Sequence, residues 1–148
     1  MNDFVNSFVN EPHNIEVEQA LLGTLLSNND LYDKVSGWVK PEHFYDPLHG
    51  RIYTAIVDCC EHGRRADPLT LKHKFSDEEP LGNDLSASQY LARLVKLAIT
   101  PISAPDYARV IQEYAILRGL IKTGTEIVQR ASSYQPGDSV DKQIEDAE

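Results

Sequence analysis

Apolar residues recur at spacings of three and four along most of the chain, which is the period of an α-helix with one buried face. The first such stretch follows Asn14, a residue type that caps helix starts, and ends near Asn28-Asn29. Its apolar positions are Ala20, Leu21, Leu22, Leu25 and Leu26. Gly23 lowers the helix propensity by about 1 kcal/mol relative to alanine, and a close helix crossing at this position would explain why it is tolerated.

Four more helices are marked before residue 100 by residues that begin or end a helix. Asp30 is the expected cap of a short helix that Pro41 ends. Asp46-Pro47 and Asp67-Pro68 each place a capping carboxylate before a proline at the first helical position, and Gly63 stops the first of these two helices. The predicted ranges are 31–40, 47–62, 69–75 and, after a polar loop from Ser76 to Leu85, 86–98 with Ser86 or Ser88 as the start.

The longest helical stretch starts at Ser103-Ala-Pro-Asp106 and meets no proline before Tyr134. This is roughly thirty residues, far above the ~11 of an average globular helix. Pro136-Gly137-Asp138 then forms a turn, and Ser139 begins another helical stretch that reaches Glu148. The expected fold is all-α, a compact globular helical bundle followed by a long antiparallel helical hairpin whose second arm is truncated.

These elements predict three parts of the chain. Residues 1–13 form a flexible arm, because their polar and aromatic repeat has nothing local to pack against. Residues 14–100 form the globular helical subdomain, and residues 101–148 form the hairpin.

Two apolar rows share one side of the long helix. The seam row has the alternating spacing of a helix packed lengthwise against another, and consists of Val110, Tyr114, Leu117, Ile121, Gly124, Val128 and Ala131. The flanking row consists of Ile116, Leu120, Ile127 and Tyr134. Together they cover near half of the circumference, more than one partner helix needs, so we expect two covering partners.

Two interpretations of these rows stay open. They pack into the chain's own body and hairpin, or they contact another protein, since heptad-like seams serve both uses. For the flanking row the truncated second arm favours a contact with another subunit or partner. The residues expected at the interface are Tyr107, Val110, Tyr114, Leu117, Leu120, Ile121, Ile127 and Val128.

Charge argues against nucleic-acid binding by this segment alone. With 14 Lys and Arg against 23 Asp and Glu, the formal net charge is -9, opposite to the basic field on which such binding depends. No apolar run is long enough to span a membrane and no signal peptide is apparent, so we expect a soluble, cytoplasmic protein. Cys59 and Cys60 are adjacent, cannot form a long-range bridge together, and are expected to be buried free thiols.

Motifs for catalysis, cofactors or metals are absent. Lys122-Thr123-Gly124-Thr125 comes nearest to a phosphate-binding loop, but its order is wrong and it lies inside a helix. The histidines His13, His43, His49, His62 and His73 lack the mutual spacing of zinc ligands on a helix. His49, beside Phe44 and Tyr45, is expected to be structural, with its ring bonded to a neighbouring backbone group. We therefore expect no catalytic, cofactor or metal site here.

Five short motifs follow one another in order. Pro12 to Gly23 (PHNIEVEQALLG) is a glutamate-rich helix start that runs into an apolar stretch ending in glycine. The others are Phe44-Tyr45 with His49 and Ile52-Tyr53, Asp67 to Leu71, Tyr90 to Leu94, and Tyr107 to Ile111 with Arg118. Each is weak alone, but together they resemble the amino-terminal domain of the DnaB family of bacterial replicative helicases. The resemblance covers about Pro12 to Glu148.

The resemblance implies a hexameric helicase that unwinds duplex DNA with ATP. Its amino-terminal domains would form a collar, pair through their hairpins and recruit primase, with a helicase loader as a further candidate partner. The motor domain, with its ATP and Mg²⁺, would lie beyond Glu148. The alternative is the helicase-binding domain of a bacterial primase, which resembles the same globule-plus-hairpin fold; Met1 and the Pro12 to Gly23 match favour the helicase.

The missing phosphate loop generates a first prediction. The chain will neither bind nor hydrolyse ATP, because it lacks the lysine and the glycine-framed amides that hold phosphates. Calorimetric titration with ATP should give no heat of binding, and binding at micromolar ATP would contradict the prediction.

Overall fold

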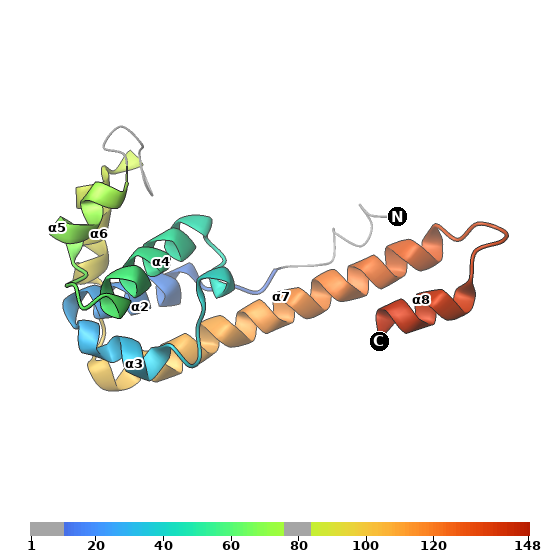
Figure 1. Cartoon of the computed structure of the whole chain (residues 1–148), viewed down its shortest axis with the longest axis horizontal. Coiled ribbons are helices and arrows are strands. Elements are labelled where there is room, and N and C mark those ends of the chain that lie inside the picture. Colours follow the sequence, from blue (N-terminus) through green and yellow to red (C-terminus); the bar gives the residue numbers. More distant parts are fainter. Residues whose placement is uncertain (1–10, 76–83) are drawn as a thin grey trace. The chain divides into compact units, whose positions relative to one another are not determined.

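The computed structural model of the chain describes residues 11–75 and 84–148 (Figure 1). Residues 1–10 of the predicted arm (1–13) and residues 76–83 of the predicted polar loop lie outside the described residues. Within the described ranges every regular element is helical, so the predicted all-α class is confirmed. The α-helices are α2 (Ile15–Ser27), α3 (Tyr32–Val35), α4 (Pro47–Glu61), α5 (Pro68–Leu71), α6 (Ala87–Lys96), α7 (Ala104–Ser132) and α8 (Val140–Ala147). Short 3-10 helices are η1 (Asn29–Leu31), η2 (Pro41–His43), η3 (Lys72–Lys74) and η5 (Pro101–Ser103).

The chain divides into two compact units. The first is His13–Tyr114, and the second is Ala115–Glu148 together with Glu11 and Pro12. The described helices include none long and apolar enough to cross a membrane.

Most of the predicted helix starts are confirmed by side-chain caps. The side chains of Asn14, Asp46, Asp67 and Ser139 accept hydrogen bonds from backbone N–H groups of the first turn of α2, α4, α5 and α8. Gly63 has a φ of 67°, the left-handed conformation that ends α4. The expected cap at Asp30 is wrong. Asn28 accepts from the Asp30 N–H instead, because the next helical turn starts directly after α2.

Helix α2 lies at the centre of the first unit and is buried along its carboxy-terminal half. Leu21, Leu22 and Leu25 are fully buried, and α2 packs most extensively on α6 and then on α4. The expected close crossing at Gly23 is confirmed, since a Cβ built there would lie 1.8 Å from the carbonyl oxygen of Leu94. The glycine lets the backbones of α2 and α6 approach more closely than any side chain would permit.

A buried polar chain, Glu18–His49–Tyr90, joins α2, α4 and α6. Glu18 and His49 are 2% and 0% exposed, with Nδ1 of His49 2.8 Å from Oε1 of Glu18. Since a carboxylate only accepts, Nδ1 carries a proton, and in the neutral imidazole Nε2 then accepts from the Tyr90 hydroxyl at 2.6 Å. The Glu18 carboxylate also accepts from the backbone N–H groups of Tyr45 at 2.8 Å and Asp46 at 3.3 Å.

The structure corrects the expected surroundings of His49. The ring forms hydrogen bonds with side chains of two other helices rather than with a neighbouring backbone group. Its partners, Glu18 and Tyr90, are 31 and 41 residues away in the sequence. Burial raises the pKa of the Tyr90 hydroxyl, which therefore stays protonated. Both cysteines are free, as predicted; Cys59 is buried, Cys60 is partly buried, and burial raises the pKa of the Cys60 thiol.

The crossing at Gly23 predicts a large difference between two alanine substitutions. Gly23→Ala should lower the free energy of unfolding by about 1–3 kcal/mol, because α2 and α6 must move apart. Gly119→Ala, in α7 with nothing within 4 Å of the added Cβ, should instead raise it by up to about 1 kcal/mol. Urea denaturation measures both, and equal effects would contradict the close crossing.

The polar chain predicts unequal costs for its members. His49→Leu leaves a buried carboxylate and a buried hydroxyl without their ring partner, so it should cost about 3–5 kcal/mol of stability. Tyr90→Phe removes the hydroxyl that bonds His49 and accepts from Gln19 at 3.4 Å, and should cost about 1–3 kcal/mol. The two variants are compared by urea denaturation. A His49→Leu protein as stable as the parent chain would show that the polar chain does not hold the helices.

Candidate protein-interaction site

Helix α7 begins inside the core of the first unit. Ala104, Ala108 and Ile111 are buried there, one helical turn apart. The guanidinium of Arg109 lies 4.5 Å from the centre of the Trp38 ring, a cation–π contact that attaches the exposed side of the same turns to the globular unit. The first turns of α7 are therefore held by packing, and the helix continues without a break through Ser132.

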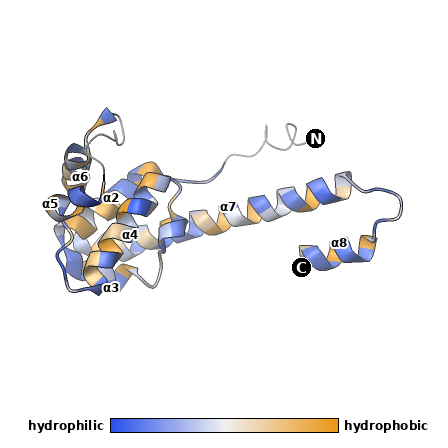
Figure 2. Cartoon of the chain, turned by 45° about the horizontal axis from the view of Figure 1, so that its top comes forward, coloured by the Kyte–Doolittle hydropathy of each residue, from blue (hydrophilic) through white to orange (hydrophobic). Residues whose placement is uncertain are grey.

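Beyond Tyr114, one side of α7 is apolar and uncharged. At 100° per residue, the apolar positions from 116 to 131 fall within about 140° of the circumference, and no charged residue falls among them. This apolar arc consists of Ile116, Leu117, Leu120, Ile121, Gly124, Ile127, Val128 and Ala131. Figure 2 shows apolar residues recurring along the length of α7 and again on α8.

The large side chains of the apolar arc are exposed to a degree that is unusual for aliphatic residues. Leu120 is 64% exposed and Ile116 is 54% exposed, and Leu117, Ile127 and Val128 lie between 40% and 45%. Scattered exposed aliphatic residues are common, but a continuous row of them on one helix marks an interaction surface.

Helix α8 packs against the last turns of α7, so the predicted hairpin is present (Figure 1). Val140 and Ile144 line a small cleft with Ile127 and Ala131. An ion pair of 3.3 Å joins Arg130 to Asp146. Eight residues of α8 extend only about 12 Å, so α8 reaches the end of the apolar arc and leaves the turns around Leu117 and Leu120 uncovered.

The opposite side of α7 is polar. Arg118, Lys122, Glu126 and Arg130 follow one another at intervals of four, on one side of the helix. The guanidinium of Arg118 donates a hydrogen bond of 2.8 Å to the backbone oxygen of Pro12. The helix is thus divided into a charged side and an uncharged side, which gives any partner a defined direction of approach.

The structure separates the eight expected interface residues into two groups. Tyr107 packs against the core of the first unit, and Val110 and Tyr114 are half-buried beside it. The other five, Leu117, Leu120, Ile121, Ile127 and Val128, belong to the apolar arc, where Ile121 is half-buried.

Two exposed apolar residues of α8 were not among the expected interface residues. Val140 and Ile144 of α8 are 57% and 56% exposed. Their spacing of four after the Ser139 cap was the signal that could have identified them.

The chemistry of the site is that of binding. The apolar arc has no titratable group, and residues 11–75 and 84–148 contain no cluster of three His, Cys, Asp or Glu placed to hold a metal ion. The arrangement offers apolar area on a long, rigid support, which is what association with another protein requires.

Comparison with known proteins gives consistent matches. Residues 10–113 match the family described as DnaB-like helicase N terminal domain. Over 137 residues, 93% of its length, the chain is 38% identical to the Replicative DNA helicase DnaB of Rickettsia conorii and 30% identical to that of Geobacillus stearothermophilus. It covers 28% and 30% of these two proteins, so it spans less than a third of their length.

A solved structure shares the fold. The N-terminal domain of DnaB helicase from Mycobacterium tuberculosis superimposes with a TM-score of 0.79 at 29% sequence identity. The match covers 93% of this chain and 95% of that one, so it extends beyond the globular unit into the second unit.

The exposure of its side chains predicts that the apolar arc contributes little to the free energy of unfolding. Leu120→Ser should change the free energy of unfolding by less than about 0.5 kcal/mol, because the side chain is 64% exposed. Ile111→Ser, earlier on the same helix and 3% exposed, should cost about 2–5 kcal/mol. Chemical denaturation at low protein concentration compares them, and a similar loss in both would make the arc part of the chain's own core.

Proposed function

Because this chain belongs to the family of DnaB-like helicase N-terminal domains, we propose that it is the protein-interaction module of a replicative DNA helicase. The family resemblance predicted from the sequence is confirmed, and the helicase is favoured over the primase alternative. The module acts in the cytoplasm and contributes no catalysis of its own. In the intact protein it supports a motor that unwinds duplex DNA with ATP and Mg²⁺.

The exposed apolar arc of α7 carries the proposal. Its residues extend over about 22 Å of helix without a charge, and α8 covers only one end. A second copy of the hairpin supplies an equally long apolar surface, and two hairpins together make four helices around a shared core. Self-pairing through the hairpin is therefore the proposed use of this surface, and the hexameric collar is assembled from such pairs.

Primase is the proposed partner of the assembled collar, with a helicase loader as a further candidate. Both follow from membership of the family rather than from a feature of this chain. The net charge of -9 supports a role in protein contacts, since a strongly acidic surface repels the DNA backbone.

The test uses two substitutions in the intact helicase, Ile121→Asn and Ile127→Thr. Interface energy concentrates in a few apolar anchors, so each should weaken self-association or primase binding by a few kcal/mol. Both lie on the apolar arc, and each should change the thermal stability only slightly. Oligomeric state by light scattering, primase affinity and melting temperature are measured separately, because each distinguishes a different outcome.

Lys122→Ala is the matched control. It lies beside Ile121 on the charged side of α7, so it should leave association and stability unchanged. If Ile121→Asn and Ile127→Thr both lose stability and keep partner affinity, these residues are ordinary core and the proposed interface is wrong.

A further inference from the structure

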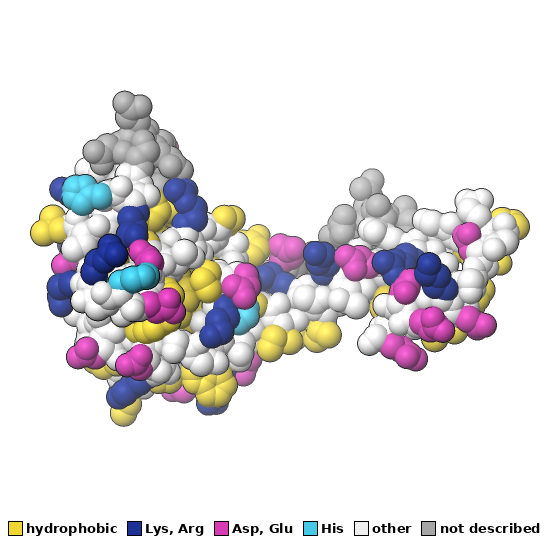
Figure 3. All heavy atoms as spheres, in the orientation of Figure 1, with side chains coloured by type: hydrophobic (Ala, Val, Ile, Leu, Met, Phe, Trp, Pro, Cys, Tyr) yellow, Lys and Arg dark blue, Asp and Glu magenta, His cyan; other side chains and the backbone are white. Residues whose placement is uncertain are grey.

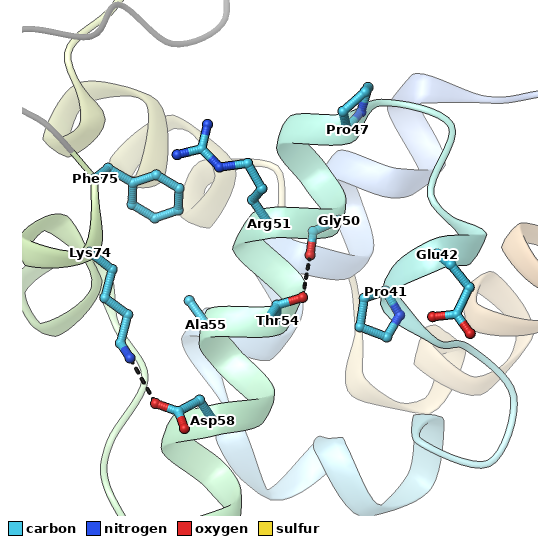
Figure 4. A pocket seen from close by; sticks show the side chains of 10 residues that line it. All are labelled: Pro41, Glu42, Pro47, Gly50, Arg51, Thr54, Ala55, Asp58, Lys74 and Phe75. Carbon is cyan, nitrogen blue, oxygen red and sulfur yellow. Dashed lines mark hydrogen bonds and ion pairs between the residues drawn. The ribbon is translucent and has the colours of Figure 1, made fainter.

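A groove of about 680 Å³ lies on α4 between η2 and the end of η3 (Figure 4). Its lining has two acidic and two basic side chains, Glu42 and Asp58 against Arg51 and Lys74. Lys74 pairs with Asp58 at 2.7 Å, and the Arg51 guanidinium lies 5.2 Å from the centre of the Phe75 ring. These charges are balanced and engaged, so the groove selects no partner. The apolar arc of α7, by contrast, has a symmetry that does.

Gly124 lies inside the apolar arc, and nothing in the described chain requires a glycine there. A glycine in the interior of a helix costs about 1 kcal/mol relative to alanine. At Gly23 an added Cβ would lie 1.8 Å from the carbonyl oxygen of Leu94, so the close crossing of α2 and α6 explains that glycine. At Gly124 an added Cβ would have no neighbour within 4 Å. The position is open to a close approach by a second molecule.

The apolar arc reads the same in both directions from Gly124. From Leu117 to Ala131 its residues are separated by 3, 1, 3, 3, 1 and 3 positions, with Gly124 in the middle. Ile116 alone lies outside this symmetry. The residues at equal distances from Gly124 are Leu117 and Ala131, Leu120 and Val128, and Ile121 and Ile127.

This symmetry suits the antiparallel pairing of two identical helices. A two-fold axis places each residue of one copy opposite the residue at the same distance on the other side of the axis. With the axis at Gly124, every member of the symmetric set therefore meets an apolar residue of the second copy. Between residues 117 and 131 no charged residue falls within the arc. Figure 3 shows charged side chains along one edge of this part of α7 and apolar side chains along the other.

Pairing about Gly124 produces layers that alternate large and small side chains. At the centre the two glycines meet, so the helix axes can approach to about 8 Å, the lower end of the range for packed helices. The outermost layers each combine Leu117 of one copy with Ala131 of the other, a large residue with a small one. The layers between them each contain Leu120 and Ile121 of one copy with Ile127 and Val128 of the other.

The same register covers the turns of α7 that α8 leaves open. Val140 and Ile144 of α8 are more than half exposed and lie beside Ile127 and Ala131, at the far end of the arc from Leu117. An antiparallel partner brings its own Ala131, and with it its α8, to Leu117. A parallel partner would bring both copies of α8 to the same end of the pair and leave none beside Leu117.

We infer that Gly124 is the crossing point of an antiparallel pair of α7 helices, through which the two-fold axis of a dimer of this chain passes. The inference rests on the self-pairing proposed above and adds its register and direction. Gly124 contributes no apolar side chain of its own. It determines specificity instead, because it fixes which turns of the two copies meet.

Two alanine substitutions on α7 test the crossing point. Gly124→Ala places a methyl group of each copy at the axis and should weaken self-association of the 148-residue chain at least about tenfold. Gly119→Ala is the matched control, because it also has nothing within 4 Å of the added Cβ but lies outside the arc, so it should leave self-association unchanged. Both substitutions favour the helix equally, so a difference between them reports the contact. Sedimentation equilibrium measures the dissociation constants.

Disulfide cross-linking tests the direction. A mixture of Leu117→Cys and Ala131→Cys chains should form a cross-linked dimer on mild oxidation. Each variant alone should not, because its two cysteines lie about 21 Å apart along the helix axis in an antiparallel pair. The parent chain, with its free Cys59 and Cys60, gives the background, and circular dichroism melting curves establish that each variant is folded.

Ile121→Asn separates a wrong register from a wrong interface. If it abolishes self-association while Gly124→Ala associates as tightly as the parent chain, the crossing point is wrong and the proposed self-pairing stands. If Leu117→Cys alone cross-links as well as the mixture does, the pair is parallel and the inference is overturned. If Ile121→Asn leaves self-association intact, or if the parent chain stays monomeric at about 100 µM, the arc is not a self-pairing surface and the inference falls with the proposed function.

Discussion

The buried chain of Glu18, His49 and Tyr90 is the interaction on which the arrangement of the globular unit depends. It joins α2, α4 and α6 at one place in the core, where every polar atom must find a partner because none is accessible to water. Apolar packing alone tolerates small shifts of one helix along another. A carboxylate held by an imidazole and two backbone N–H groups does not, so the polar chain sets the register in which the helices pack.

That register has consequences for the close crossing of α2 and α6. The backbone of α6 passes directly over Gly23, and the Tyr90 hydroxyl reaches His49 from the same helix. The hydrogen bond from the Ile99 N–H to Thr24 then holds the chain just beyond α6 against α2. The start of α7 is buried in this same core through Ala104 and Ala108. Helix α7 therefore begins within a packed core. A binding surface requires rigid support of this kind.

Folding stability and the proposed binding depend on different parts of α7. Its first turns are buried and belong to the core, whereas its later turns expose an uncharged apolar arc and stabilise little within the chain. An uncharged arc favours a partner with an equally apolar surface.

The helices and most of their caps could be predicted from the sequence, because the hydrogen bonds and contacts that form them are local. The Asn14 and Ser139 side chains bond N–H groups three residues away, and a spacing of three or four is visible in the sequence. The close crossing at Gly23 could also be predicted, since a residue of low helix propensity inside a helix indicates a close contact there. Only the tertiary structure decided that Glu18 meets His49, that η2 and η3 enclose a groove on α4, and which apolar residues of α7 stay exposed. Those contacts join residues tens of positions apart, and proximity of that kind results from the packing of all the helices together rather than from the period of any one of them.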